Sequence, residues 1–215
     1  MTTFEYWGTE LHGVAHLYNH TWANERFVEL AVARHWMSRH ARVRGGLEVG
    51  NVLSHYSECH HDVVDRYEPA AWYQYLAHQW VSNIDVLQIA GSYPWIVSLS
   101  TLEHIATDTP PYDHPGAVVA LNHLRRRLAP GGAMLVSWPT GVNAALDTYL
   151  AAGADGATRA CTISRGAGPE VWVQDEHPVI RPYGADSPHP FAGQWAEAVA
   201  FVEFDNMDKP ARAVG

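Results

Sequence analysis

The stretch that decides the fold is residues 117–137, AVVALNHLRRRLAPGGAMLVS. Its first half carries one apolar helix face, formed at three- and four-residue spacing by Val118, Leu121, Leu124 and Leu128. The Pro-Gly-Gly at 130–132 cannot continue a helix, so it predicts where the helix ends. The apolar run at 133–137 then predicts a buried strand. A helix, a turn and a strand in succession are the repeating unit of an α/β sheet.

The same alternation extends in both directions from this stretch. Upstream, we predict a helix from Asn24 onward and strands at 47–50, 62–67 and 93–99, with an aromatic, helix-like stretch at 72–80. Downstream, we predict a helix at 142–152, two strands at 159–165 and 171–174 joined by the turn at 166–169, and a last strand at 196–204. Strands that alternate with helices through residue 150 imply parallel crossovers, and the last third of the chain adds an antiparallel hairpin.

We therefore predict an α/β fold with a doubly wound, mostly parallel seven-stranded sheet and a C-terminal antiparallel hairpin. One domain is expected over residues 1–215. Within it, 1–40 would form an N-terminal helix and partial lid, 45–140 a ligand-binding core, and 141–205 a C-terminal helix and edge strands. Sheets of this kind bind ligands beyond the carboxyl ends of their strands.

The net charge and the cysteine content limit which binding partners and which cellular compartment we expect. The net charge is −9, which argues against a nucleic-acid partner, because such binding is driven largely by Lys and Arg. Cys59 and Cys161 lie far apart and suit a reducing cytoplasm. No apolar run approaches the roughly 20 residues of a membrane span. We expect a cytoplasmic protein with a small-molecule partner, and the sequence leaves a homodimer open.

Two strand ends carry the residues that suggest a ligand site. Residues 47–54, LEVGNVLS, read as a strand followed by a glycine turn, where a ligand can approach the backbone closely. Val52 and Ser54 stand where a glycine-rich turn would have further glycines, so this segment also fits a turn without a ligand. The strand at 62–67 ends in Asp65, and a carboxylate there can accept hydrogen bonds from both ribose hydroxyls.

Four segments, in this order, carry a resemblance to a known family. They are LEVG at 47–50, VVD at 63–65, IVSLSTLEHI at 96–105 and the L-x-PGG-x-x-LV pattern at 128–136. Together they resemble the class I S-adenosylmethionine-dependent methyltransferase superfamily over about residues 45–140. The resemblance implies S-adenosylmethionine as the cofactor and methyl transfer to an oxygen or nitrogen atom of a small molecule.

The resemblance also implies which residues would hold the cofactor. They are Glu48, Gly50, Asn51 and Val52 after the first strand, Asp65 and Arg66 after the second, Asp85 and Val86 after the third, and Ser98 in the fourth. Val52, Ser54 and Pro94 depart from the family pattern. The departures motivate an alternative, a degenerate member that serves as a binding or partner subunit. A nicotinamide-dependent oxidoreductase would need further glycines in the first turn.

The candidate proton acceptors are His104 and His55, since a methyl acceptor can need a base and histidine titrates near neutral pH. Residues 16–26 precede the first core strand and could close over the pocket. Metal-capable side chains also occur together at His55, Cys59, His60, His61 and Asp62. Their spacing matches no closed zinc pattern, so the sequence predicts no metal at this cluster and leaves open a catalytic metal held by other histidines.

Overall fold

The computed structural model describes residues 2–68, 81–105, 116–167, 171–183 and 196–206. Its main sheet has eight strands in the order β5-β4-β3-β6-β7-β10-β8-β9. Their bounds are β3 Leu47–Val49, β4 Asp62–Val64, β5 Val81–Ser82, β6 Tyr93–Leu99, β7 Leu128–Pro139, β8 Arg159–Arg165, β9 Trp172–Gln174 and β10 Ala198–Asp205. The aromatic stretch expected at 72–80 lies outside the described residues.

The strand directions confirm the predicted class of fold. Strands β5, β4, β3, β6 and β7 all run parallel to one another. Strand β10 is antiparallel to both β7 and β8. Strands β8 and β9 form the expected antiparallel hairpin. The sheet has one strand more than the seven predicted, and the last strand of the chain is inserted between β7 and β8 rather than added at an edge. Every residue from Ala198 to Phe204 is buried in this position, as is usual for a strand with neighbours on both sides.

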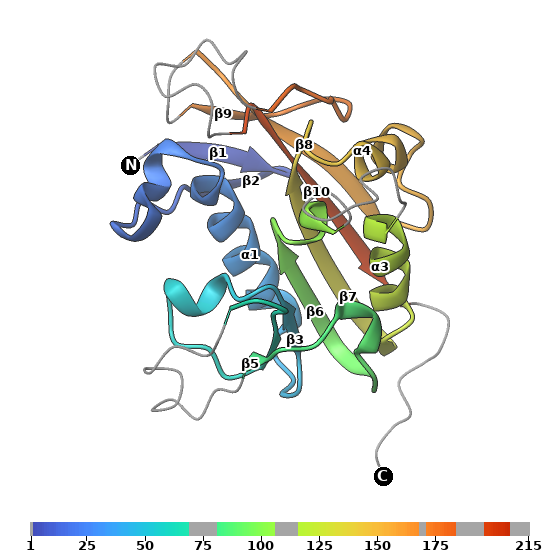
Figure 1. Cartoon of the computed structure of the whole chain (residues 1–215). Helices are drawn as coiled ribbons and strands as arrows, with labels where there is room; N and C mark the ends of the chain where they lie inside the picture. Colours follow the sequence, from blue (N-terminus) through green and yellow to red (C-terminus); the bar gives the residue numbers. More distant parts are fainter. Residues whose placement is uncertain (1, 69–80, 106–115, 168–170, 184–195, 207–215) are drawn as a thin grey trace.

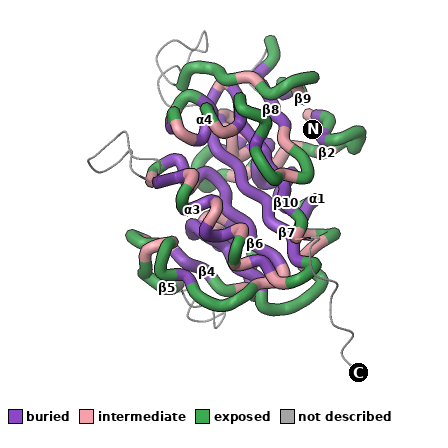
Figure 2. Tube along the Cα trace, turned by 90° about the vertical axis from the view of Figure 1, so that its right-hand side faces the viewer, coloured by how far each residue is buried: buried purple, intermediate pink, exposed green. Residues whose placement is uncertain are grey.

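Helices cover both faces of the sheet (Figure 1). Helix α1 (Arg26–His40) packs on one face, where Phe27, Leu30 and Trp36 are buried in one apolar cluster. Helices α3 (Gly116–Arg125) and α4 (Ala144–Ala151) pack on the other face in a second cluster. Figure 2 shows the buried trace running through the central strands, with exposed turns around them. No described helix is long and apolar enough to cross a membrane.

The Pro-Gly-Gly at 130–132 sits differently from our expectation. The helix ends earlier, at Arg125, and β7 already begins at Leu128, so these residues belong to the strand. The pairing of β6 with β7 shifts register between Tyr93 and Trp95 at this point. A Cβ at Gly132 would lie 2.9–3.0 Å from three carbonyl oxygens, so the glycine permits a close approach of two backbones.

The N-terminus contains a hairpin that the sequence pattern did not indicate. Strands β1 (Thr3–Tyr6) and β2 (Thr9–His12) form a separate two-stranded antiparallel sheet. Trp7 and Gly8 connect them with positive φ angles of 50° and 75°, as a tight hairpin turn requires. Tyr6 attaches this hairpin to the core by donating a 2.7 Å hydrogen bond to Glu203 on β10. A Trp-Gly turn lacks the usual Asn-Gly or Asp-Gly signal, which explains the omission.

In the described part of the chain, four short 3₁₀ helices follow strands or precede helices. They are η1 (Tyr18–Ala23), η2 (Leu53–His55), η3 (Val86–Gln88) and η4 (Leu102–His104). Helices η2, η3 and η4 lie directly after or near the carboxyl ends of β3, β5 and β6. They therefore gather at the edge of the sheet where parallel sheets of this type bind ligands.

Candidate functional site

A cavity of about 470 Å³ lies at the carboxyl ends of β3, β4 and β6. Its volume falls within the range of roughly 300–1,000 Å³ that ligand pockets occupy. The residues proposed from the sequence that line it are Asn51, Val52, Asp65, Arg66, Asp85, Val86 and His104. Arg26, Val49, Val64, Tyr67, Glu68, Ile84, Ser100, Thr101 and Ile105 complete the described lining. The strand ends thus bring together residues that lie up to 79 positions apart in the chain, as Arg26 and Ile105 do.

Gly50 and Glu48 shape the turn at the base of this cavity. Gly50 has a φ of +88°, and a Cβ on it would lie 1.9 Å from the Thr101 hydroxyl oxygen. Glu48 is buried beneath the turn, where its Oε1 accepts the backbone N–H groups of Val52 at 2.8 Å and Leu53 at 2.7 Å. Glu48 therefore holds the turn in place from below, without lining the cavity.

Asp65 is tied to the same turn and still faces the cavity. Its Oδ2 accepts the N–H of Asn51 at 3.1 Å, and its Oδ1 accepts those of Tyr67 at 2.9 Å and Glu68 at 2.7 Å. A carboxylate oxygen can accept two hydrogen bonds, and Asp65, which lines the cavity, uses Oδ2 for the contact with Asn51. These contacts fix the carboxylate before any ligand arrives.

Asp85 and Arg66 form the rim of the cavity at the ends of β5 and β4. Asp85 caps η3, because its side chain accepts the N–H of Leu87 at 2.9 Å and closes a capping box with Gln88. Arg66 donates to Asp85 at 2.9 Å, and both side chains are more than a third exposed. Such an exposed ion pair contributes little to stability, so it can open for a ligand at small cost.

Ser98 and His55, like Glu48 and Gly50, were proposed from the sequence but lie outside the cavity lining. Ser98 is fully buried and donates a 2.9 Å hydrogen bond to the Val49 carbonyl, which links β6 to β3. His55 stacks on Tyr18 with ring centroids 4.7 Å apart and pairs with Glu68 at 2.7 Å. His55 thus reaches the site through Glu68, a residue of the lining, and joins it to the segment 16–26.

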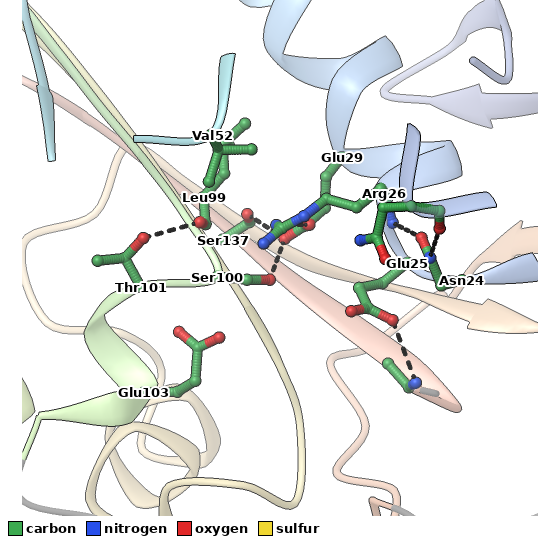
Figure 3. Close-up of polar contacts among 12 residues, drawn as sticks. Asn24, Glu25, Arg26, Glu29, Val52, Leu99, Ser100, Thr101, Glu103 and Ser137 are labelled. Atoms are coloured by element: carbon green, nitrogen blue, oxygen red, sulfur yellow. Dashed lines mark hydrogen bonds and ion pairs between the residues drawn. The ribbon is translucent and has the colours of Figure 1, made fainter. Parts of the chain in front are cut away.

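A set of charged side chains borders the cavity at α1, and the sequence pattern did not single out its central acid, Glu29. Figure 3 shows Glu25, Arg26, Glu29 and Glu103 gathered beside the ends of β6 and β7. Glu29 is fully buried, and its Oε1 accepts the hydroxyl groups of Ser100 and Ser137, each at 2.6 Å, while its Oε2 pairs with Arg26. The signal was present as an acid inside the apolar run FVELAVA at 27–33.

Burial and mutual repulsion govern the charge of this set. Burial raises the pKa of Glu103 well above its usual value, and burial followed by the charge of Glu29 raises that of Glu25. Burial acts against the charge of Arg26, but the neighbouring carboxylates, Glu29 foremost, outweigh it and raise the Arg26 pKa. Because one guanidinium faces three carboxyl groups, protonation of Glu103 reduces the excess negative charge.

Ser100 gives this end of the cavity its backbone geometry. It follows β6 with a φ of +38°, an uncommon conformation for a residue other than glycine. Its hydroxyl bond to Glu29 and its backbone bond to Ser137 at 3.0 Å hold it there. Strained residues of this kind persist where the surroundings fix them, and they concentrate at functional sites.

We predict that Glu103→Gln flattens the dependence of stability on pH. A carboxyl group whose pKa is raised on folding contributes stability that is full below its unfolded pKa, near 4.5, and is lost as the pH rises through the folded pKa. The melting temperature of the wild type should therefore fall as the pH rises above about 4.5 and through the raised pKa of Glu103. That of Glu103→Gln should fall less and exceed the wild type at the upper end of that pH range. Glu58→Gln, at an exposed position, is the matched control, and equal slopes for all three proteins would contradict the prediction.

Comparison with known proteins returned matches among solved structures. No protein-family model matches the chain, and no curated sequence matches it significantly. The N-methyltransferase NodS from Bradyrhizobium japonicum WM9 is 16% identical, covers 85% of this chain and 96% of its own, and superposes with a TM-score of 0.49. Magnesium protoporphyrin IX methyltransferase from Synechocystis PCC 6803, solved with bound S-adenosylmethionine, is 14% identical over 81% of this chain and 78% of its own, with a TM-score of 0.47. The glycopeptide N-methyltransferase MtfA is 14% identical over 80% and 84%, with a TM-score of 0.39. At these values the likenesses assign neither an activity nor a substrate to this chain.

Proposed function

We propose that this protein is an S-adenosylmethionine-dependent methyltransferase that transfers a methyl group to an oxygen or nitrogen atom of a small molecule. The observation that carries the proposal is the cavity at the carboxyl ends of β3, β4 and β6, which has Asp65 and Asp85 in its lining. Open α/β sheets bind nucleotide-like ligands at this edge, with an acid after a strand for the ribose. Three of the four sequence segments that resemble class I methyltransferases, those at 47–50, 63–65 and 96–105, belong to the strands and turns that build this edge.

The residues present fit the adenosine part of the cofactor. The second acceptor position of Asp65 Oδ2 would receive a ribose hydroxyl, and Ile84 and Val86 supply apolar surface for the base. Gly50 keeps the turn free of a side chain that would collide with Thr101. Asp85 would accept from the exocyclic amino group of the adenine, after its ion pair with Arg66 opens.

The methionine part would be held without the full set of backbone donors that a glycine-rich turn offers. The N–H groups of Val52 and Leu53 point to Glu48, so they are not available to a ligand. Arg26 lines the cavity from the start of α1 and supplies a positive charge for a carboxylate. We therefore assign Arg26, from the proposed lid segment 16–26, to this end of the cofactor.

The chemistry requires little beyond alignment and removal of a proton. Bound S-adenosylmethionine supplies an electrophilic methyl group, and holding an acceptor in line with it can contribute about 7–11 kcal/mol. His104 lines the cavity with its Nε2 3.7 Å from Glu103 Oε1, whereas His55 packs on Tyr18 and pairs with Glu68. We assign to the His104 imidazole the role of taking the proton from the acceptor atom.

Asp65→Asn should weaken cofactor binding by roughly tenfold or more, because it removes the charge from a hydrogen bond worth about 1.5–3 kcal/mol. Asparagine keeps the shape of the side chain and one acceptor oxygen for the backbone. Equilibrium dialysis with labelled S-adenosylmethionine measures the dissociation constant. Asp62→Asn, at the exposed start of the same strand, is the matched control. Equal affinities for both variants and the wild type would remove Asp65 from the site.

A second candidate function is binding without catalysis, as a degenerate member of the same fold. Val52 and Ser54 in place of glycines favour it, together with the use of the Val52 N–H by Glu48. A chain that binds S-adenosylmethionine but transfers no label to a panel of small amines, phenols and carboxylic acids would support this candidate over the enzyme.

A further inference from the structure

A second group of side chains converges behind the turn at Gly50, on the side of the sheet that α1 covers. The carboxylate of Glu48, the thiol of Cys59 and the imidazole of His61 each present one donor atom, and these atoms lie within 4.8 Å of one another. All three residues are buried. Cys59 and His61 also line a cavity of about 380 Å³, separate from the one at the strand ends.

The path of the chain accounts for this convergence. Residues 56–61 connect η2 to β4 without helix or strand, and from 58 to 61 their side chains alternate between exposed and inward positions. Cys59 and His61 point inward, whereas Glu58 and His60 are exposed and pair with each other at 3.7 Å. Glu48 comes from β3, beside the strand that this connection enters.

We propose that Glu48, Cys59 and His61 form a binding site for a divalent transition-metal ion, with Zn²⁺ as the ion the donors suit best. Thiolate, imidazole and carboxylate are the three donor types that zinc takes in proteins. A carboxylate and a thiolate with a neutral imidazole balance the two positive charges of the ion. Water from the cavity that Cys59 and His61 line would supply the fourth ligand of the ion.

The separations between donor atoms suit a tetrahedral ion. Bonds of about 2.0–2.3 Å at tetrahedral angles place neighbouring donors roughly 3.3–3.6 Å apart. His61 Nε2 and Glu48 Oε2 are 2.8 Å apart, and no pair in the group exceeds 4.8 Å. Small side-chain movements would therefore bring all three donor atoms to bonding distance. Without an ion, Glu48 and His61 pair with each other, and the Cys59 thiol donates a 3.6 Å hydrogen bond to the Ser57 carbonyl. An ion bound at the site would replace these contacts.

Neighbouring groups already orient two of the donors. Glu48 Oε1 is held by the backbone N–H groups of Val52 and Leu53, which leaves Oε2 directed at His61. The His61 ring packs edge-on against Trp95, with centroids 5.1 Å apart. Such outer contacts fix the direction of metal ligands and commonly change metal affinity by 10–100-fold when they are lost.

The site has a consequence for the turn at Gly50. Glu48 would bind the ion through one oxygen and the turn through the other, so an ion at this site would join residues 56–61 to the wall of the larger cavity. The inference does not depend on methyl transfer, because none of the three donor residues lines that cavity.

Cobalt spectroscopy on the full chain tests the site. The protein is stripped with a chelator, dialysed, and titrated with Co²⁺, and Zn²⁺ is then added in competition. The wild type should show the visible bands of tetrahedral Co²⁺ with a near-ultraviolet thiolate-to-cobalt charge-transfer band, and Zn²⁺ should abolish both. Cys59→Ser should lose the charge-transfer band, and His61→Ala should bind at least about tenfold more weakly.

His60→Ala is the matched control, since it removes the adjacent exposed histidine. His60→Ala should bind Co²⁺ as the wild type does. Zn²⁺ should raise the melting temperatures of the wild type and His60→Ala but not that of Cys59→Ser. Circular dichroism of each metal-free variant establishes that it is folded, and Glu48→Gln replaces any variant that is not. Absence of a charge-transfer band in the wild type, its survival in Cys59→Ser, or an equal loss of binding in His60→Ala would each overturn the proposal.

Discussion

Gly50→Ala is expected to reduce the affinity for S-adenosylmethionine by roughly 100-fold or more. The added Cβ would lie 1.9 Å from the Thr101 hydroxyl oxygen, and the φ of +88° disfavours any side chain. The turn or the end of β6 must therefore move, and both belong to the wall of the cavity. A displacement on the order of 1 Å in a positioned site can cost about 100-fold. Titration calorimetry with the cofactor measures the effect.

Gly45→Ala separates the collision from the backbone strain. Gly45 has a φ of +90°, nearly that of Gly50, but a Cβ there would have nothing within 4 Å. Gly45→Ala should lower the free energy of unfolding by only about 1–2 kcal/mol, the cost of a left-handed backbone conformation at alanine. The affinity for S-adenosylmethionine should stay unchanged. Equal affinities for the two variants would show that the contact with Thr101 does not shape the cavity.

Glu29→Ala is expected to lower the free energy of unfolding by about 3–5 kcal/mol, which is the range for removing one partner of a buried ion pair. The side chain is fully buried and accepts from Ser100, Ser137 and Arg26, so its loss leaves two buried hydroxyl groups without their acceptor. Urea denaturation, monitored by tryptophan fluorescence, measures the change in the free energy of unfolding.

Glu29→Gln provides the comparison for that experiment. Glutamine keeps an acceptor oxygen for the two serines and removes the charge, so it should lose less stability than alanine. Glu10→Ala, at an exposed position on β2, should change the free energy of unfolding by no more than about 0.5 kcal/mol. A loss at Glu29→Ala of less than 1 kcal/mol, as an exposed ion pair would give, contradicts the assigned role of Glu29.

The elements of the parallel sheet could be predicted from the sequence because their residues carry strong local signals. The run at 93–99 is apolar and bounded by polar residues, and it forms β6 over those same residues. The strand ends at Gly50, Asp65 and Asp85 then follow from the rule that parallel strands present their carboxyl ends at one edge. The structure brings Asp65, Asp85 and His104 around one cavity for that reason.

The groups that the sequence did not indicate depend on contacts between distant segments. Glu29 reads as one acid in an amphipathic helix, and only the packing of α1 on β6 and β7 brings it to Ser100 and Ser137. Cys59 and His61 match no zinc spacing, because their third partner is a strand residue that precedes them, Glu48. No local pattern encodes such a meeting.

Ser98 shows why position after a strand does not by itself assign a role. It lies in the strand that precedes the cavity, but the alternation of side chains along β6 turns its hydroxyl toward the Val49 carbonyl. Ser100, two residues further and past the end of the strand, lies in the lining instead. A one- or two-residue difference at a strand end thus separates a residue that supports the sheet from one that faces a ligand.

Isothermal titration of the wild-type chain with S-adenosylmethionine, repeated after saturation with S-adenosylhomocysteine, tests the proposed role of the cavity at the strand ends most directly. We predict a saturable, stoichiometric binding heat with a dissociation constant well below millimolar. Prior saturation with S-adenosylhomocysteine, the product of methyl transfer, should abolish this heat. A rise in melting temperature should accompany it. A chain that gives neither saturable heat nor a thermal shift at millimolar cofactor does not bind this nucleoside, and its cavity at the strand ends then serves some other ligand.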